Sequence, residues 1–303
     1  MTKAPENIAL SIRNRLTQRA RERRENAQLL MTRYVIERVL YRLSVSPYRE
    51  RFVLKGAMLF SLWTRAPYRS TGDLDLLGVG ENAPAAIADV FARILALPVE
   101  CDGIAFRPGT LRAIAARDED EYSGVKLNFV ADLAGARLPV QIDIGFGDVI
   151  TPGSVDIEYP SLVDQPRPRL RAYPPETVVA EKFQAVVALG MPNSRMKDFF
   201  DLWAISEAFD FDGALLARAI TNTFERRGTP LPSETPVALT AEFAEAKQAQ
   251  WAAFLRRTEI ALVPEAISIA KDRIAEFIIP LLTATKRGSR IDARWTAGGP
   301  WRE

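Results

Sequence analysis

The chain has 303 residues, 48% of them hydrophobic and 26% charged, and a formal net charge of +2, the composition of an ordinary folded protein. It contains no histidine and a single cysteine, Cys101, which excludes an intramolecular disulfide framework, a cysteine-based zinc cluster and any catalytic site built on histidine. The remaining chemistry must use carboxylates, lysine, arginine, tyrosine, hydroxyl groups or a hard metal ion, and hard ions such as Mg²⁺ prefer carboxylate oxygens.

The charges are unevenly distributed. Residues 1–55 include 13 basic and 5 acidic residues, whereas the rest of the chain includes 27 basic and 33 acidic ones. A basic arm beside an acidic body suits a polyanionic substrate such as RNA, although an arginine-rich, solvated helix face explains it equally well. The N-terminus does not resemble a signal peptide, and no apolar run approaches the ~20 residues that span a bilayer. We therefore expect a cytoplasmic protein with no membrane partner.

The predicted elements indicate an α+β protein. Helical periodicity over 5–45 predicts two amphipathic helices, and Ser46-Pro47 ends the second. After them we expect strands at 51–54 and 73–77 on either side of a helix at 57–64, then a helix at 83–97 and strands at 110–116, 125–132 and 137–146.

A proline-rich stretch, 151–175, predicts a boundary between two domains. Beyond it the periodicity predicts helices at 176–189, 197–209, 213–227, 240–257 and 264–282. A basic tail at 285–303 is expected to be loosely ordered or laid over the surface. The expected organisation is a mixed sheet with flanking helices and basic N-terminal helices, 1–165, followed by a helical domain, 166–303.

The most informative residues are Asp73 and Asp75. On a strand, residues two apart point to the same face, so these carboxylates project side by side while Leu74 and Leu76 face the core. Two carboxylates this close repel each other unless a cation lies between them. Mg²⁺ fits, because one or two carboxylates usually hold it while phosphates and waters complete its octahedron. A bare Asp-x-Asp is also common at solvated strand edges, so the neighbouring residues must distinguish a metal site from such an edge.

Those neighbours include Gly56, which permits the turn that opens the helix at 57–64. Free backbone N–H groups at a helix start attract phosphate. The chain order therefore predicts an anion-binding turn beside a metal-binding strand, with the basic and hydroxyl run Arg69-Ser70-Thr71 close to it.

Asp143 is a third candidate carboxylate. Ile142 and Ile144 alternate with it, so it lies on the opposite face of its strand. A neighbouring strand that brings it beside Asp73 and Asp75 would let it share a metal ion or accept the proton of an attacking hydroxyl. Alternatively, Asp143 and Asp148 only solubilise a strand and its turn.

Lys182 and Asp198 are candidates in the helical domain. Lys182 lies in an apolar helical stripe, which costs free energy unless it snorkels to solvent or has an anionic partner such as a triphosphate. Asp198 shares a helix face with Leu202 and is expected to point inward, toward Lys182 or an incoming group. Asp201 is interpreted as a helix-face charge or a surface partner of a neighbouring basic residue.

These blocks together resemble the AbiEii/AbiGii nucleotidyltransferase toxin family, which includes the MenT-type toxins and belongs to the DNA polymerase β-like nucleotidyltransferase superfamily. The matching residues span 52–203: the Lys55-Gly56 turn, Arg69-x-Thr71-x-Asp73-Leu74-Asp75, Glu181-Lys182, and Arg195-x-Lys197-Asp198-x-x-Asp201-Leu202.

The resemblance implies a two-lobed fold and transfer of a nucleotide from a nucleoside triphosphate (NTP), dependent on Mg²⁺ or Mn²⁺, to an RNA acceptor, expected to be a tRNA 3′ end. It also implies a toxin that a cognate antitoxin neutralises. Carried over to this sequence, Asp73 and Asp75 hold the metal, Lys182 binds the phosphates, and Asp198 is needed for catalysis. The strand pattern adds Asp143 to the candidate metal ligands and catalytic residues. The nucleotide is expected to contact five residues: Lys55, Gly56, Arg69, Thr71 and Lys182.

The sequence departs from the family at one place. The family usually has a second glycine and then Ser or Thr after the first glycine, where this chain has Ala57 and Met58. A hydroxyl contact is therefore missing, and Ser61 or the pair Ser70 and Thr71 would have to replace it. The departure concerns nucleotide affinity more than the class of reaction.

Three other functions fit the same residues. One is a nucleotidyltransferase of this fold that modifies a protein or a small molecule. Another is a non-catalytic nucleotide- or RNA-binding protein, favoured by the altered turn after Gly56. The third is a kinase that uses the same carboxylates to transfer a γ-phosphate.

Overall fold

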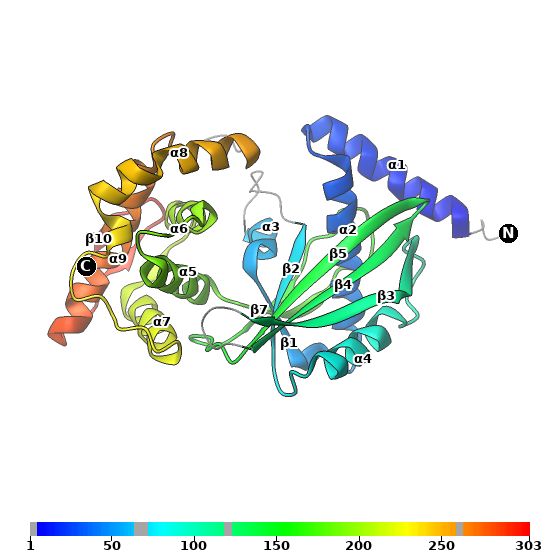
Figure 1. The fold of residues 1–303 in the computed structure, drawn as a ribbon, viewed down its shortest axis with the longest axis horizontal. Coiled ribbons are helices and arrows are strands. Elements are labelled where there is room, and N and C mark those ends of the chain that lie inside the picture. The colour runs from blue at the N-terminus through cyan, green and yellow to red at the C-terminus, as the bar shows by residue number, and fades with distance from the viewer. Residues whose placement is uncertain (1–4, 64–71, 118–122, 259–262) are drawn as a thin grey trace. The chain divides into compact units, whose positions relative to one another are not determined.

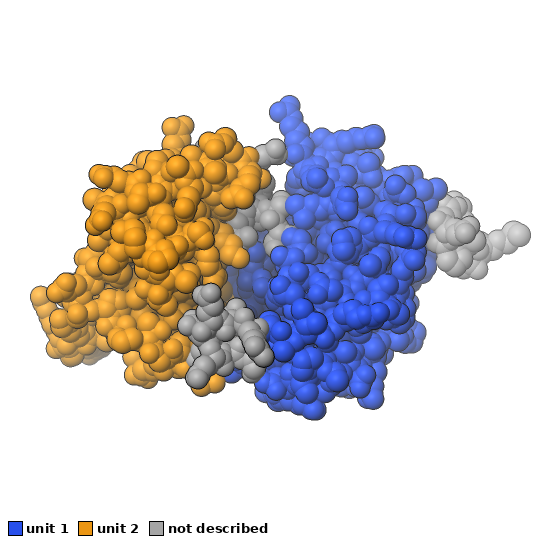
Figure 2. All heavy atoms as spheres, in the orientation of Figure 1, with its two compact units in different colours: residues 1–66, 70–147, 155–172 blue, residues 67–69, 148–154, 173–303 orange. Residues whose placement is uncertain are grey.

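The computed structural model describes residues 5–63, 72–117, 123–258 and 263–303. They form two compact units, coloured separately in Figure 2. The first contains 5–63, 72–117, 123–147 and 155–172, and the second contains 148–154, 173–258 and 263–303. No described helix is both long and apolar enough to cross a membrane. The domain boundary at residue 165 stays a prediction; contacts within the structure pass to the second unit after Ala172.

A seven-stranded mixed sheet is the centre of the first unit, in the order β3–β4–β5–β2–β1–β7–β6 (Figure 1). β2 runs parallel to β5, and β1 parallel to β7, whereas the other neighbours are antiparallel. The strands are β1 (Phe52–Lys55), β2 (Asp73–Gly78), β3 (Ile104–Arg117), β4 (Ser123–Leu133), β5 (Ala136–Phe146), β6 (Val155–Glu158) and β7 (Arg169–Ala172).

Helices cover one face of this sheet. α2 packs on β5 and β7, α4 packs on β3 and β4, and α1 packs on α2 and β4 (Figure 1). The helical elements of the unit are α1 (Pro5–Arg23), α2 (Ala27–Ser44), η1 (Arg49–Arg51), η2 (Gly56–Leu59), α3 (Phe60–Trp63) and α4 (Pro84–Leu95).

The apolar residues of β2 and β5 are buried under the helices, so the side chains that alternate with them lie on the opposite face of the sheet. Leu74, Leu76 and Ile142 are fully buried and Ile144 is nearly so, and each such burial stabilises the fold by about 1.5–3 kcal/mol. A slip of one residue would turn these side chains to the opposite face, so the register is strongly fixed. We call the face of the sheet opposite α2 and α4 the carboxylate face, because Asp73, Asp75 and Asp143 lie on it.

The predicted α+β class and mixed sheet are confirmed, with differences in detail. The helix expected at 57–64 begins instead as the 3₁₀ helix η2 and continues as α3, and residue 64 lies outside the described part of the chain. β3 begins at Ile104, earlier than expected. The proline-rich stretch contains two strands, β6 and β7, that the sequence did not predict, because four-residue strands beside prolines carry almost no periodicity.

The second unit is mainly helical, as expected. Its helices are α5 (Pro175–Leu189), α6 (Met196–Ala208), α7 (Gly213–Arg226), η3 (Val237–Leu239), α8 (Ala241–Thr258) and α9 (Ile267–Arg287).

Of the two alternatives for the tail, loose order is wrong, because part of the tail forms strands that pair with the helical unit. β9 (Arg294–Trp295) and β10 (Trp301–Arg302) form a small sheet with β8 (Phe211–Asp212). The Trp295 ring is fully buried, its centroid lies 4.9 Å from that of Phe277, and its Nε1 donates to the Ser206 carbonyl at 2.7 Å. A tryptophan with both its ring and its N–H satisfied anchors the tail to the helices.

Part of the basic N-terminal charge serves the fold. Arg13 and Arg19 of α1 each donate to a backbone carbonyl elsewhere in the unit, both at 2.6 Å. Arg15 pairs with Asp164 at 2.8 Å. These three arginines therefore attach α1 to the rest of the unit, and the excess of basic residues in 1–55 overstates the charge available to a partner.

A buried ion pair on α2 accepts hydrogen bonds that attach this helix to the segment before β7. The fully buried Glu37 carboxylate accepts from Arg38 Nη2 at 2.6 Å. It also accepts from Ser161 Oγ at 2.9 Å and the Leu162 N–H at 2.8 Å. Burial raises the pKa of the Glu37 carboxyl, and these partners oppose that shift. Removing one charge would leave the other buried without compensation.

We therefore predict that Glu37→Ala lowers the free energy of unfolding by about 3–5 kcal/mol. The control is Asp164→Ala in the same segment, whose exposed pair with Arg15 should contribute less than about 1 kcal/mol. Equilibrium unfolding in urea measures both. Equal losses in the two variants would show that the buried pair does not hold this segment.

Candidate functional site

The acidic residues of the carboxylate face lie in register on adjacent strands. In the parallel pair β2–β5, Asp75 is opposite Asp143 and Asp73 is opposite Gln141. Lys55 of β1 is opposite Asp75 on its other side. The structure thus brings the three predicted carboxylates onto two neighbouring strands, with Lys55 one strand further along.

Basic and amide groups surround Asp143. Its Oδ2 accepts a hydrogen bond from Gln141 Nε2 at 2.8 Å, and Lys126 Nζ lies 3.7 Å from its Oδ1. The Asp143 side chain is 35% exposed, so it remains open to solvent. A carboxylate open to solvent can bind a metal ion or accept a proton from a substrate.

Gly56 lies directly against the Asp75 carboxylate. Its φ is +73°, and a Cβ added there would lie 2.1 Å from Asp75 Oδ2 and 2.6 Å from Cγ. Every other amino acid would collide with Asp75 and would also be strained at this φ. The glycine therefore lets the backbone turn at the end of β1 touch the carboxylate.

The carboxylates suit a hard divalent ion. Among the described residues no three acidic, cysteine or histidine side chains are grouped closely enough to hold a metal ion by themselves. Mg²⁺ does not require three, because one or two carboxylates hold it together with substrate phosphates and waters. Asp75 and Asp143 in register, with Asp73 on the same face, are oxygen donors of the kind and number that this ion needs.

The residues after Gly56, Ala57 and Met58, depart from the family pattern, and their burial gives a structural reason. Ala57 and Met58 are buried, and Tyr159 Oη lies within hydrogen-bonding distance of the Met58 carbonyl. Met58 therefore fills core space. The Ser61 hydroxyl accepts from Arg33 Nη2 at 3.0 Å, so it already has a partner.

Some predicted residues cannot be placed. Arg69 and Thr71, which were expected to contact the nucleotide, lie outside the described residues, as does Ser70.

Lys182, in the second unit, is bound by two buried aspartates. Its Nζ lies 2.9 Å from Asp198 Oδ1 and 2.6 Å from Asp201 Oδ2, and both carboxylates are fully buried. Asp198 points toward Lys182, as the sequence suggested. The interpretation of Asp201 as a helix-face charge is wrong, because tertiary packing against α5 buries the face of α6 that carries it.

Arg195 adds a second cation. Its Nε lies 2.7 Å from Asp198 Oδ2, although that oxygen receives no aligned hydrogen bond from any described group. Two aspartates and two cations thus balance in this cluster. Buried charges survive only when paired, so the cluster holds the Lys182 ammonium in a fixed position.

A second ionic cluster surrounds Arg227, and the sequence did not reveal it. Its guanidinium lies 2.9 Å from Asp148 and 3.4 Å from Glu181, and it donates to Gln184 Oε1 at 2.9 Å. Burial lowers the pKa of Arg227, but the two carboxylates outweigh that effect and the pKa is raised. Tyr173 donates to Glu181 at 3.0 Å, and burial together with this carboxylate raises the tyrosine pKa.

The Arg227 cluster corrects the view of Asp148 as a solubilising charge, because its side chain is only 10% exposed. The partners are far apart in sequence. In the sequence, only the Glu181-Lys182 motif pointed to a member of this cluster.

A search of curated proteins gave no match. Two crystal structures of Helicobacter pylori proteins are similar in fold. A candidate nucleotidyltransferase is 13% identical, with 88% of this chain and 99% of that chain covered at a TM-score of 0.49. The protein JHP933 is 14% identical, with 87% and 95% covered, also at 0.49.

A sequence model of one protein family matches residues 38–273, over three quarters of the chain. The match is wider than the motifs at 52–203 and includes both the carboxylate face and the Lys182 cluster. The family is described as the nucleotidyl transferase AbiEii toxin of type IV toxin–antitoxin systems. The chain therefore belongs to the AbiEii nucleotidyltransferase toxin family.

Proposed function

We propose that this nucleotidyltransferase transfers a nucleotide from an NTP to the 3′ end of an RNA, with tRNA as the expected acceptor, using Mg²⁺ or Mn²⁺. Family membership supplies the class of reaction. The observation that carries the rest is the register of Asp75 with Asp143, with Asp73 on the same face and the Gly56 turn in contact with Asp75. This arrangement supports the proposal of a cation site next to a phosphate site.

In the proposed reaction, the acceptor hydroxyl oxygen forms a bond to the α-phosphorus of the NTP. The bond from that phosphorus to the oxygen bridging to the β-phosphate breaks, and pyrophosphate leaves. Asp143 accepts the hydroxyl proton, a role that its exposure to solvent allows. A divalent ion would be held by Asp73 and Asp75 together with substrate phosphates and waters, with Asp143 as the alternative ligand when it does not act as the base, and it would stabilise the developing negative charge.

The backbone turn at Gly56 and the Lys55 side chain are proposed to bind the triphosphate, because this turn and Lys55 both lie beside Asp75. Arg69 and Thr71 keep their predicted nucleotide contacts. For Lys182, a phosphate contact remains a prediction, and any such phosphate must compete with the Asp198 and Asp201 carboxylates that already bind its ammonium.

Membership of a toxin–antitoxin family implies an antitoxin partner. We propose that this partner is a protein encoded alongside the chain and that it suppresses the transfer reaction.

We predict that Asp73→Ala lowers the transfer of label from an α-³²P-labelled NTP to total RNA by at least about a hundredfold, because charge stabilisation in the transition state is lost. The matched control is Asp156→Ala, which removes an exposed carboxylate from β6 of the same sheet and should leave transfer unchanged. Expression in bacteria should arrest growth with the wild type and not with Asp73→Ala. Unchanged label transfer in Asp73→Ala would refute the site.

The products of the assay distinguish RNA nucleotidyl transfer from the three alternative functions. If the label appears on a protein or a small molecule and not on RNA, that molecule is the acceptor. Release of a nucleoside diphosphate instead of pyrophosphate would indicate a kinase, and NTP binding without either product would indicate a non-catalytic binder.

We also predict that chelation of divalent ions abolishes the reaction. With EDTA in excess, pyrophosphate release should fall to the background of the Asp73→Ala variant, and added Mg²⁺ or Mn²⁺ should restore it. Full activity in EDTA would contradict the metal requirement.

Gly56→Ala tests the contact between the turn and the carboxylate. The new Cβ would displace Asp75, so we predict a loss of transfer of at least about tenfold and weaker Mn²⁺ binding, measured by titration. The control is Gly80→Ala, just after β2, where φ is +90° and nothing lies within 4 Å of the added Cβ. Both variants carry the backbone strain of about 1–2 kcal/mol, so equal activity in the two would show that the contact with Asp75 is unimportant.

A further inference from the structure

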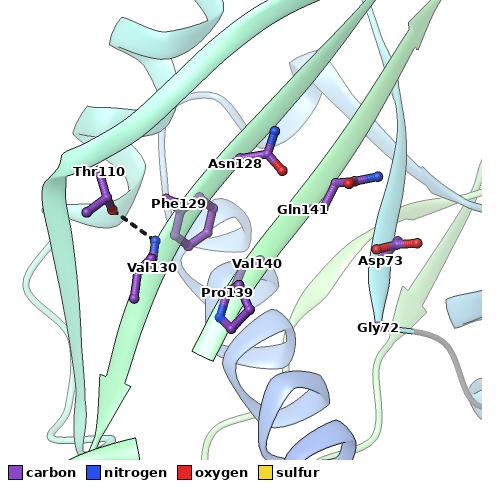
Figure 3. A pocket seen from close by; sticks show the side chains of 9 residues that line it. All are labelled: Gly72, Asp73, Thr110, Asn128, Phe129, Val130, Pro139, Val140 and Gln141. Carbon is purple, nitrogen blue, oxygen red and sulfur yellow. Dashed lines mark hydrogen bonds between the residues drawn. The ribbon is translucent and has the colours of Figure 1, made fainter. Parts of the chain in front are cut away.

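A pocket of about 350 Å³ opens on the carboxylate face beside Asp73. Figure 3 shows the side chains of Asn128, Gln141 and Asp73 following one another across the adjacent strands β4, β5 and β2. Val130 and Pro139, which are also paired across β4 and β5, supply apolar surface. The pocket belongs wholly to the first unit, and none of the roles predicted from the sequence involves Asn128 or Gln141.

An irregularity of β3 shapes the far wall. The register with β4 shifts between Arg107 and Arg112. There Thr110 Oγ1 accepts from the Val130 N–H at 2.9 Å (Figure 3). The same hydroxyl donates to the Arg107 carbonyl at 2.7 Å. The hydroxyl replaces a bond that the regular ladder would make, and bulges of this kind frequently border active sites.

The position of the pocket relative to Gly56 has a chemical consequence. The Gly56 turn approaches Asp75 from the β1 side of β2, whereas the pocket lies on the β5 side. In phosphoryl transfer the attacking and leaving oxygens lie roughly in line on opposite sides of the phosphorus. If the leaving pyrophosphate is at the Gly56 turn, the attacking hydroxyl comes from the side of the pocket.

The chemistry of the pocket suits a nucleoside. Each amide side chain offers both a donor and an acceptor, which match the edges of unpaired bases and the ribose hydroxyls of RNA. Gln141 also donates to Asp143, so it links the pocket to the carboxylate proposed to accept the proton. Lys126 and Arg112, on the same face of β4 and β3, provide positive charge for the phosphates that precede an RNA terminus.

We infer that this pocket binds the terminal nucleoside of the acceptor RNA, with Asn128 and Gln141 as its hydrogen-bonding residues. The inference rests on the proposed function and adds the location of the acceptor. Through Gln141 the pocket also positions Asp143 next to the attacking hydroxyl.

The test compares RNA binding with NTP use. The double variant Asn128→Ala/Gln141→Ala loses two amides, which should raise the Kd for a 5′-fluorescein-labelled single-stranded RNA about tenfold, measured by anisotropy without NTP. The KM for RNA should rise by a similar factor, while the KM for NTP stays unchanged. Asn14→Ala/Gln18→Ala, which removes the same residue types from exposed positions on α1, should match the wild type.

Two outcomes overturn the inference while leaving the proposed function intact: an unchanged Kd and KM for RNA in the pocket variant, or an increase confined to the KM for NTP. A wild type that neither binds nor labels RNA overturns the proposed function as well. If the double variant unfolds, Asn128→Asp serves instead, because it keeps the size of an exposed side chain and adds a charge that should repel RNA. Unchanged RNA binding in Asn128→Asp then counts against the pocket.

Discussion

The contact between Gly56 and the Asp75 carboxylate is the constraint on which the candidate site depends. A backbone that turns at positive φ, with a carboxylate oxygen where a Cβ would stand, admits glycine alone. The contact fixes the end of β1 against β2 and places backbone N–H groups beside an anionic side chain. The metal and nucleotide sites of the proposed function both depend on this contact.

The sheet arranges the remaining groups around that contact. β2 and β5 are parallel because α4, β3 and β4 intervene between them in the chain, and this crossover brings Asp143 into register with Asp75. Across the carboxylate face the side chains change from the carboxylates of β2 and β5, through the amides Gln141 and Asn128, to the cations of β4 and β3. The order of strands thus places negative oxygens and positive charges at opposite ends of one face, and the proposed metal and RNA sites depend on this separation.

In the second unit two basic side chains are paired with buried or largely buried carboxylates. Lys182 and Arg227 each face two carboxylates, and all four carboxylates come from another helix or a distant part of the chain. Buried pairs of this kind add little net stability, since desolvation offsets their attraction. Their effect is geometric: an ammonium held by Asp198 and Asp201 keeps one position.

The sequence by itself determined the α+β class, most helices and long strands, and the pairing of Asp73 with Asp75, because periods of 3.6 and 2 are local properties of the chain. It also identified Asp143, Lys182 and Asp198 as candidate site residues. Only the tertiary structure decided that Asp143 stands opposite Asp75 and that Asp201 is a second partner of Lys182. It alone decided that the tail is anchored through Trp295 and that Asn128 borders the site. Strand register, helix packing and the pairing of short strands depend on residues distant in sequence, so no local pattern records them.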